Sequence, residues 1–66
     1  MNNVKKVRKK INLRQIDLAK KANLSMTWLW ALENGFDERV SKSIKDRVAR
    51  ALGVEYDELF PPKNEG

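Results

Sequence analysis

The 66-residue sequence contains no cysteine and no histidine. The absence of cysteine excludes a disulfide framework, and it fits a protein of the cytosol. Without either residue, a zinc site would have to use carboxylates alone, which zinc sites rarely do. A chain of this length forms a single domain with a small core. We therefore expect well-packed helices, with no metal or other cofactor, which a dimer partner could stabilise further.

The sequence also lacks a long apolar run and the usual signals of catalysis. No segment approaches the ~20 apolar residues of a membrane-spanning helix, and residues 1–3 lead into a basic segment without the apolar region of a secretory signal. There is no glycine-rich phosphate loop, and no pair of carboxylates shares a face with room for a pocket. These absences predict a cytoplasmic protein that is not an enzyme and has no membrane partner.

Positive charge is concentrated in the first third of the chain. The formal net charge is +5, but residues 1–21 hold eight basic residues against Asp17 alone, a balance of +7, and residues 22–66 carry −2. A basic half beside a mildly acidic half suggests a face that meets a polyanion. The alternative is a solvated helix surface, which is how we interpret the exposed lysines of the first helix, Lys5, Lys6, Lys9 and Lys10.

Apolar residues recur at helical spacing in five segments, and no segment shows the alternation of a strand. The expected helices cover residues 4–11, 14–22, 26–34, 41–52 and 56–60, with a loop at 36–40. The first has an apolar stripe of Val4, Val7 and Ile11, and Ile16 is one of the apolar residues of the second. Residues 1–60 are expected to form the domain and residues 61–66 a short tail, in which Pro61-Pro62 ends regular structure and residues 63–66 are expected to be disordered.

Polar residues mark the helix starts. Asn3, Ser25 and either Ser41 or Ser43 are expected to cap the first, third and fourth helices with their side chains, whereas Arg14 is a weak cap for the second.

The helix ends and the corner between the second and third helices carry residues that tolerate a positive φ. Asn12 is a plausible stop for the first helix, and Asn23 is expected to form a tight corner with a positive φ. Gly35 and Gly53 end the third and fourth helices.

The order and spacing of several short motifs point to one family. The residues are Gln15, Leu18-Ala19, Leu24-Ser25, Leu29, Leu32, Glu33-Asn34-Gly35, Ala51-Leu52-Gly53-Val54 and Asp57-Glu58-Leu59-Phe60. Together with five short helices and a tight corner, they resemble the helix-turn-helix of Cro/cI-type (XRE-like, lambda-repressor-like) DNA-binding domains over residues 4–60. The resemblance implies an all-α, compact bundle of about five short helices.

The resemblance also implies a function and a site. It implies a sequence-specific, repressor-like regulator of a bacterial or phage-type cytosol, which binds double-stranded DNA as a homodimer on a two-fold operator. The third helix would lie in the major groove and the second across the backbone. Base-reading positions would be Met26, Thr27, Trp30 and Ala31. Phosphate contacts would be Arg14, Gln15, Ser25, Asn34, Arg39 and Lys42.

The sequence departs from the family pattern on the reading face. This face lacks the Gln, Arg or Asn that makes bidentate base contacts, and Trp30 stands where a small residue is common. Met26, Trp30 and Ala31 offer apolar contact, for example to thymine methyl groups, and Thr27 offers one hydroxyl. Specificity could instead rest on DNA shape, or the helix could serve a protein partner. The second functional hypothesis is therefore an antitoxin or adaptor-type protein-interaction module.

Arg8 and Glu33 both lie at the border of apolar stripes, on helices that should pack together. Because the family often has a buried Arg–Glu pair at this spacing, we expect a structural ion pair; the alternative is two surface charges.

Other positions also keep two interpretations. Trp28 is expected to pack on the loop after the third helix, and Trp30 either faces DNA or folds onto its neighbours. Met26 could be only an exposed helix former. The cations Arg14, Arg39 and Lys42 could serve solubility alone, and Tyr56, Leu59 and Phe60 are expected in the core or in a dimer contact.

Overall fold

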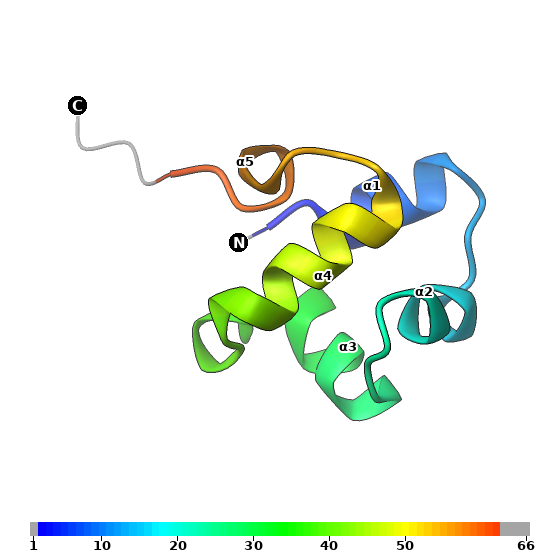
Figure 1. The fold of residues 1–66 in the computed structure, drawn as a ribbon, viewed down its shortest axis with the longest axis horizontal. Helices are drawn as coiled ribbons and strands as arrows, with labels where there is room; N and C mark the ends of the chain where they lie inside the picture. The colour runs from blue at the N-terminus through cyan, green and yellow to red at the C-terminus, as the bar shows by residue number, and fades with distance from the viewer. Residues whose placement is uncertain (1, 63–66) are drawn as a thin grey trace.

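The computed structural model describes residues 2–62, and the described chain is entirely helical apart from its turns. The elements are α1 (Val4–Lys10), α2 (Gln15–Lys21), α3 (Met26–Glu33), the short 3-10 helix η1 (Asp37–Arg39), α4 (Lys42–Leu52) and α5 (Tyr56–Leu59), shown in Figure 1. This architecture confirms the predicted all-α bundle. Among residues 2–62, no helix is long and apolar enough to cross a bilayer. Residues 63–66 of the predicted tail lie outside the described range.

The core is built from one apolar face of each α-helix. Leucine and valine side chains from α1, α2, α3, α4 and α5 are fully buried, among them Val4, Leu18, Leu29, Val48 and Leu59. Both α2 and α5 pack on α4, and α1 contacts both α3 and α4. In Figure 1, α3 lies at the lower edge, while α1 and α5 lie above it. The core therefore holds α3 from one side and leaves its other side open.

Two asparagines end α1 and turn the chain between α2 and α3. Asn12 has φ 57° and Asn23 has φ 54°, in the left-handed region that asparagine tolerates better than most residues. These values confirm the predicted stop after α1 and the predicted corner between α2 and α3. The corner sets the angle at which α3 leaves α2.

The start of α1 differs from the prediction. Asn3 is the N-cap residue, but its side chain makes no cap hydrogen bond. Its Nδ2 donates instead to the carbonyl oxygen of Glu58, 2.9 Å away, and the Oδ1 of Asn2 accepts from the N–H of Val4 at 3.0 Å. The side chain of Asn3 is thus used to join the N-terminus to α5.

Ile11, Ile16 and the loop at residues 36–40 depart from the predicted pattern, whereas the cap of α4 is one of the two residues predicted for it. Ile11 is 50% exposed because α1 ends at Lys10 and the stripe does not continue, and Ile16 is 46% exposed on the outer side of α2. The segment predicted as a loop contains η1, after which Val40 is buried. Ser41 rather than Ser43 caps α4, since its Oγ accepts from the N–H of Ile44 at 3.3 Å.

Candidate nucleic-acid interface

Helix α3 is fixed at its start and along its inner face. Leu29 and Leu32 are fully buried. The Oγ of Ser25 accepts from the backbone N–H of Trp28 at 3.2 Å, which is the predicted cap. Residues three and four apart share a helix face, so burial of these leucines turns the residues between them outward.

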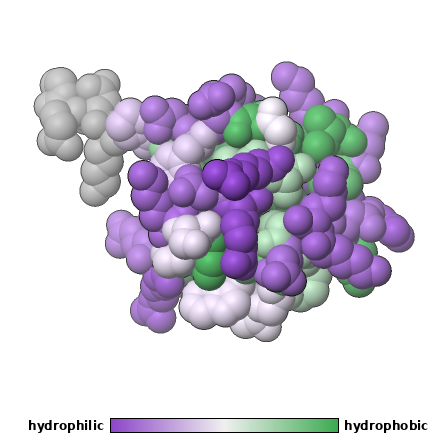
Figure 2. All heavy atoms as spheres, viewed as in Figure 1, coloured by the Kyte–Doolittle hydropathy of each residue, from purple (hydrophilic) through white to green (hydrophobic). Residues whose placement is uncertain are grey.

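The four predicted base-reading residues lie on the outward side of α3. Met26 is 43% exposed, Trp30 is 55% exposed, Thr27 is exposed, and Ala31 is half-buried. Figure 2 shows that the lower edge of the molecule, where α3 lies, is pale and thus of intermediate hydropathy, whereas hydrophilic side chains, with hydrophobic ones between them, cover the rest of this face. The geometry leaves this side of α3 accessible to a partner.

Trp30 contacts a neighbouring ring, as one of its two predicted interpretations has it, and keeps an exposed side. Trp30 stacks on Phe36, with ring centroids 5.9 Å apart and planes inclined by 20°. Trp28, which was predicted to pack on the loop after α3, is 44% exposed and lines one hollow together with the loop residues Phe36 and Arg39. The α3 side chains and the loop together line a shallow hollow of about 350 Å³, formed by Thr27, Trp28, Trp30, Ala31, Phe36 and Arg39. We call this feature the aromatic hollow.

Arg8 and Glu33 form a buried ion pair, so they are not two surface charges. The Nε of Arg8 donates to Oε2 of Glu33 at 2.6 Å, and the two side chains are only 9% and 1% exposed. Arg8 also donates from Nη1 to the carbonyl oxygen of Leu13 at 2.8 Å. The pair therefore joins the end of α3 to α1 and to the turn before α2.

Gln15 belongs to the same network, which the sequence did not indicate. Its Nε2 donates to Oε1 of Glu33 at 2.8 Å, and the residue is half-buried. A carboxamide has two N–H groups and an acceptor oxygen, so one N–H remains for a phosphate. The predicted phosphate ligand is thus also a link that holds the start of α2 against the end of α3.

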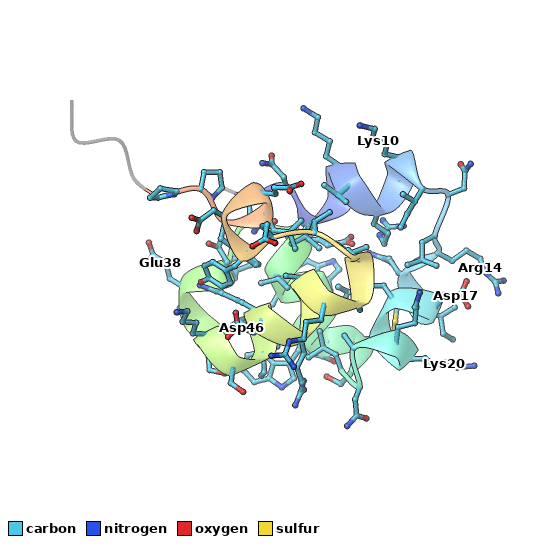
Figure 3. The ribbon with its side chains drawn as sticks, turned by 45° about the horizontal axis from the view of Figure 1, so that its top comes forward. Lys10, Arg14, Asp17, Lys20, Glu38 and Asp46 are labelled. Atoms are coloured by element: carbon cyan, nitrogen blue, oxygen red, sulfur yellow. The ribbon has the colours of Figure 1, made fainter. Side chains whose placement is uncertain are left out.

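Arg14 is exposed and already paired. Its Nε donates to Oδ2 of Asp17 at 2.8 Å, and the two side chains lie together at the edge of the molecule in Figure 3. The hydrogen bond from Arg14 lowers the pKa of Asp17 below its usual value. The same contact raises the pKa of Arg14. A phosphate at this position would have to compete with the Asp17 carboxylate for the guanidinium.

The other predicted phosphate contacts fall in separate places. Asn34 is exposed, and its Nδ2 donates to the carbonyl oxygen of Trp30 at 2.8 Å, so its amide closes the end of α3. Arg39 lies at the rim of the aromatic hollow. The Nζ of Lys42 lies 5.4 Å from the centre of the Tyr56 ring, so this lysine faces α5 rather than the hollow.

Two cations that the sequence did not assign to the site lie near the corner between α2 and α3. The Nη2 of Arg47 donates to the carbonyl oxygen of Asn23 at 3.0 Å, which brings α4 to the corner. Lys20 and Met26 line a second shallow depression beside the same corner. Sequence reasoning missed Arg47 because the contact spans 24 positions and only the packing of α4 creates it.

Comparison with known proteins identifies the family of this chain. A family model described as helix-turn-helix, of the XRE/cI type, matches residues 4–59, and it is a DNA-binding regulatory family rather than an enzyme family. No curated protein and no solved structure matches the chain. The matched range includes all five α-helices and the corner at Asn23. With nearly its whole described length covered, the chain belongs to the XRE/cI-type helix-turn-helix family of DNA-binding regulators.

Proposed function

We propose that this protein is a sequence-specific, repressor-type transcriptional regulator that binds a two-fold operator as a homodimer in a bacterial or phage-type cytoplasm. The observation that carries the proposal is the exposed outer face of α3, with Arg14 on one flank at the start of α2 and Arg39 on the other flank in η1. The major groove of B-DNA accepts a single helix. In this docking, Met26 and Thr27 approach the bases first, with Trp30 and Ala31 one turn further along.

The phosphate contacts follow from the same docking. The start of α2 presents free backbone N–H groups, which favour an anion, and Gln15 keeps one N–H for it. Arg14 contributes once a phosphate replaces Asp17, and Arg39 reaches the backbone from the other side. Ser25 and Asn34 complete the contacts near the two ends of α3, and Lys42 contributes only if its side chain leaves the Tyr56 ring.

Dimerisation makes the site two-fold. Family members of this kind read half-sites that lie about one helical turn apart on one side of the duplex. Leu59 and Phe60 are buried inside the protomer, so α5 uses these residues for its own core, and Tyr56 is the half-buried member of the group. A dimer contact at this end of the molecule therefore has to rest on exposed neighbours.

Selection of bound sequences from random DNA duplexes tests the proposal. We expect enrichment of a half-site that recurs in inverted orientation. Thr27→Ala and Gln15→Ala should then weaken binding of the selected duplex at about 0.15 M salt, while Lys6→Ala, an exposed position on α1, should not at that salt concentration. Unfolding curves for each variant separate lost contacts from lost stability, which matters for Gln15 because of its bond to Glu33. Failure of every duplex to bind at low salt would refute the regulator.

One observation favours a second candidate, an antitoxin or adaptor-type module that binds a protein. Trp28, Trp30 and Phe36 are 44%, 55% and 45% exposed and border one hollow. Exposed tryptophan is typical of protein-interface hot spots. Tryptophan fluorescence distinguishes the two: a change in emission on addition of the selected duplex supports the regulator, whereas a change only with a protein partner supports the module.

A further inference from the structure

The outer face of α3 is unusual in its chemistry. Its hydrogen-bonding side-chain groups are the hydroxyl of Thr27 and the indole N–H of Trp30. The nearest carboxamides are engaged elsewhere, since Gln15 donates one N–H to Glu33 and has its other N–H assigned to a phosphate, and Asn34 donates to the carbonyl oxygen of Trp30. Bidentate recognition of guanine or adenine needs a guanidinium or a free carboxamide at this surface. The α3 residues themselves therefore lack the groups that read purines, and the one guanidinium beside them, that of Arg39 in η1, lies at the rim of the aromatic hollow.

The aromatic hollow instead offers apolar contact. Its lining is mainly apolar, and the stack of Trp30 on Phe36 holds the large indole ring in place. Aromatic side chains contribute a large contact area with few rotatable bonds, so they lose little entropy on binding. Among the base edges in the major groove, the C5 methyl group of thymine is the apolar feature. A methyl group at the floor of the hollow would contact Ala31 and the face of an aromatic ring.

The charges around the hollow favour DNA over an apolar protein surface. Arg39 lies at the rim of the hollow, and Lys20 borders the depression beside Met26. Arg47 lies at the nearby corner. An apolar face flanked by cations complements a groove in which base methyl groups lie between two rows of phosphates.

We propose that the protein selects its binding sites through pyrimidine C5 methyl groups, with Trp30, Ala31 and Thr27 as the residues that determine this specificity. The proposal rests on the proposed DNA-binding function and names the feature of DNA that the site recognises. It implies half-sites with thymine at the positions facing the hollow. Because 5-methylcytosine carries the same group at the same place, it should substitute for cytosine with a gain in affinity wherever that methyl group reaches the hollow.

Exchange of thymine for deoxyuridine in the selected duplex tests the proposal, since it removes the methyl group and keeps the pairing. We expect about a fourfold loss of affinity for each contacted methyl group, from the value of one buried methylene-sized group. The same exchange outside the half-sites is the matched control and should change nothing. With Trp30→Ala, which should fold because Trp30 is exposed, the difference between the thymine and deoxyuridine duplexes should shrink.

Two results would overturn the proposal, and only the second would also overturn the proposed function. Equal affinity for the thymine and deoxyuridine duplexes, with specific binding intact, would refute methyl recognition and leave the regulator in place. The absence of binding to every duplex at low salt would refute both the regulator and the methyl recognition that depends on it.

Discussion

The buried pair of Arg8 and Glu33 joins α3 to α1 and to the turn before α2. Both charges have left water, and each is satisfied by several hydrogen bonds, with Gln15 and the carbonyl oxygen of Leu13 completing the set. Among the described residues, no buried side-chain nitrogen or oxygen lacks a partner. Such a network stabilises the fold little more than apolar residues of the same size would. Removal of one member, however, lowers the free energy of unfolding strongly, because the others stay buried without a partner.

Replacement of one charge should therefore destabilise the fold severely. For Glu33→Gln we expect the free energy of unfolding to fall by about 3–5 kcal/mol, because Arg8 stays buried without a counter-ion. Urea denaturation followed by circular dichroism measures the loss. The double variant Arg8→Met/Glu33→Leu is the control and should recover part of it. A loss in Glu33→Gln as small as that of a surface substitution would contradict a buried pair in solution.

Asp17 forms an ion pair with Arg14, a cation that the proposed function assigns to a DNA phosphate. Because its pKa is lowered by Arg14, the ionised carboxylate is favoured in the folded protein. The pair is therefore present above the usual pKa of aspartate and is lost as the pH falls through the lowered pKa. At neutral pH the pair is intact, and DNA has to displace Asp17 from Arg14.

Neutralisation of Asp17 should strengthen DNA binding. We expect Asp17→Asn to raise affinity for the selected duplex and to make the salt dependence steeper by up to about one phosphate contact. Glu58→Gln on α5 removes the same charge from an exposed position on the far side of α4 and should have little effect. Fluorescence anisotropy at several salt concentrations measures both. Lower affinity in Asp17→Asn would contradict a phosphate role for Arg14.

Among the secondary elements, the turn between α2 and α3 sets the direction of α3. Its conformation depends on Asn23, whose φ of 54° is unfavourable for a residue with a β-carbon. The carbonyl oxygen of Asn23 also accepts the hydrogen bond from Arg47. The turn is therefore fixed by its own backbone and by α4.

Substitutions at Asn23 should follow backbone preference. Asn23→Ala should lower the free energy of unfolding by about 1 kcal/mol, since alanine tolerates the left-handed region poorly. Asn23→Gly should be neutral or slightly stabilising. Chemical denaturation compares the two, with Asn12→Ala as a second residue of the same conformation at φ 57°. Equal stability of the Ala and Gly variants would contradict a strained corner.

At the scale of the elements, the sequence predicts helix faces and turns, but it does not predict the contacts between helices. Helical spacing identified the faces of Leu29, Leu32 and Val48, and the asparagine turns followed from local backbone preference. Spacing alone failed for Ile11 and Ile16, because burial depends on which helix lies opposite. The links from Gln15 to Glu33 and from Arg47 to Asn23 span 18 and 24 positions and arise only from packing. The outward face of α3 was predictable, whereas the stack on Phe36 was not.

In the molecule as a whole, the lysines of α1 lie apart from the exposed face of α3. The lysines of α1 are exposed, as expected, but α1 lies above α3 and not beside its open face (Figure 1). Long-range attraction does not need contact, since the field of a basic domain extends over about a Debye length. In this account, the α1 lysines raise the rate of encounter with DNA, and residues around α3 hold the complex.

This division of labour predicts a kinetic effect without a change in specificity. Lys6→Ala/Lys9→Ala should slow association at low salt and leave the ranking of duplex sequences unchanged. Stopped-flow mixing with labelled duplex measures the rate, and the difference should fade at about 0.15 M salt, where screening shortens to about 8 Å. A changed sequence ranking would place these lysines in the interface instead.

The salt dependence of duplex binding tests the central claim most directly. Each phosphate neutralised by a cation contributes about −0.9 to the slope of log affinity against log salt. With Arg39 and Lys42 in contact, and with Arg14 neutralised by Asp17 rather than by salt ions, we expect a slope of about −2 for one protomer and about −4 for a dimer on the selected operator. A line of this steepness would support docking of α3 with its basic flanks on DNA. A slope near zero, or no binding at the lowest salt, would contradict it.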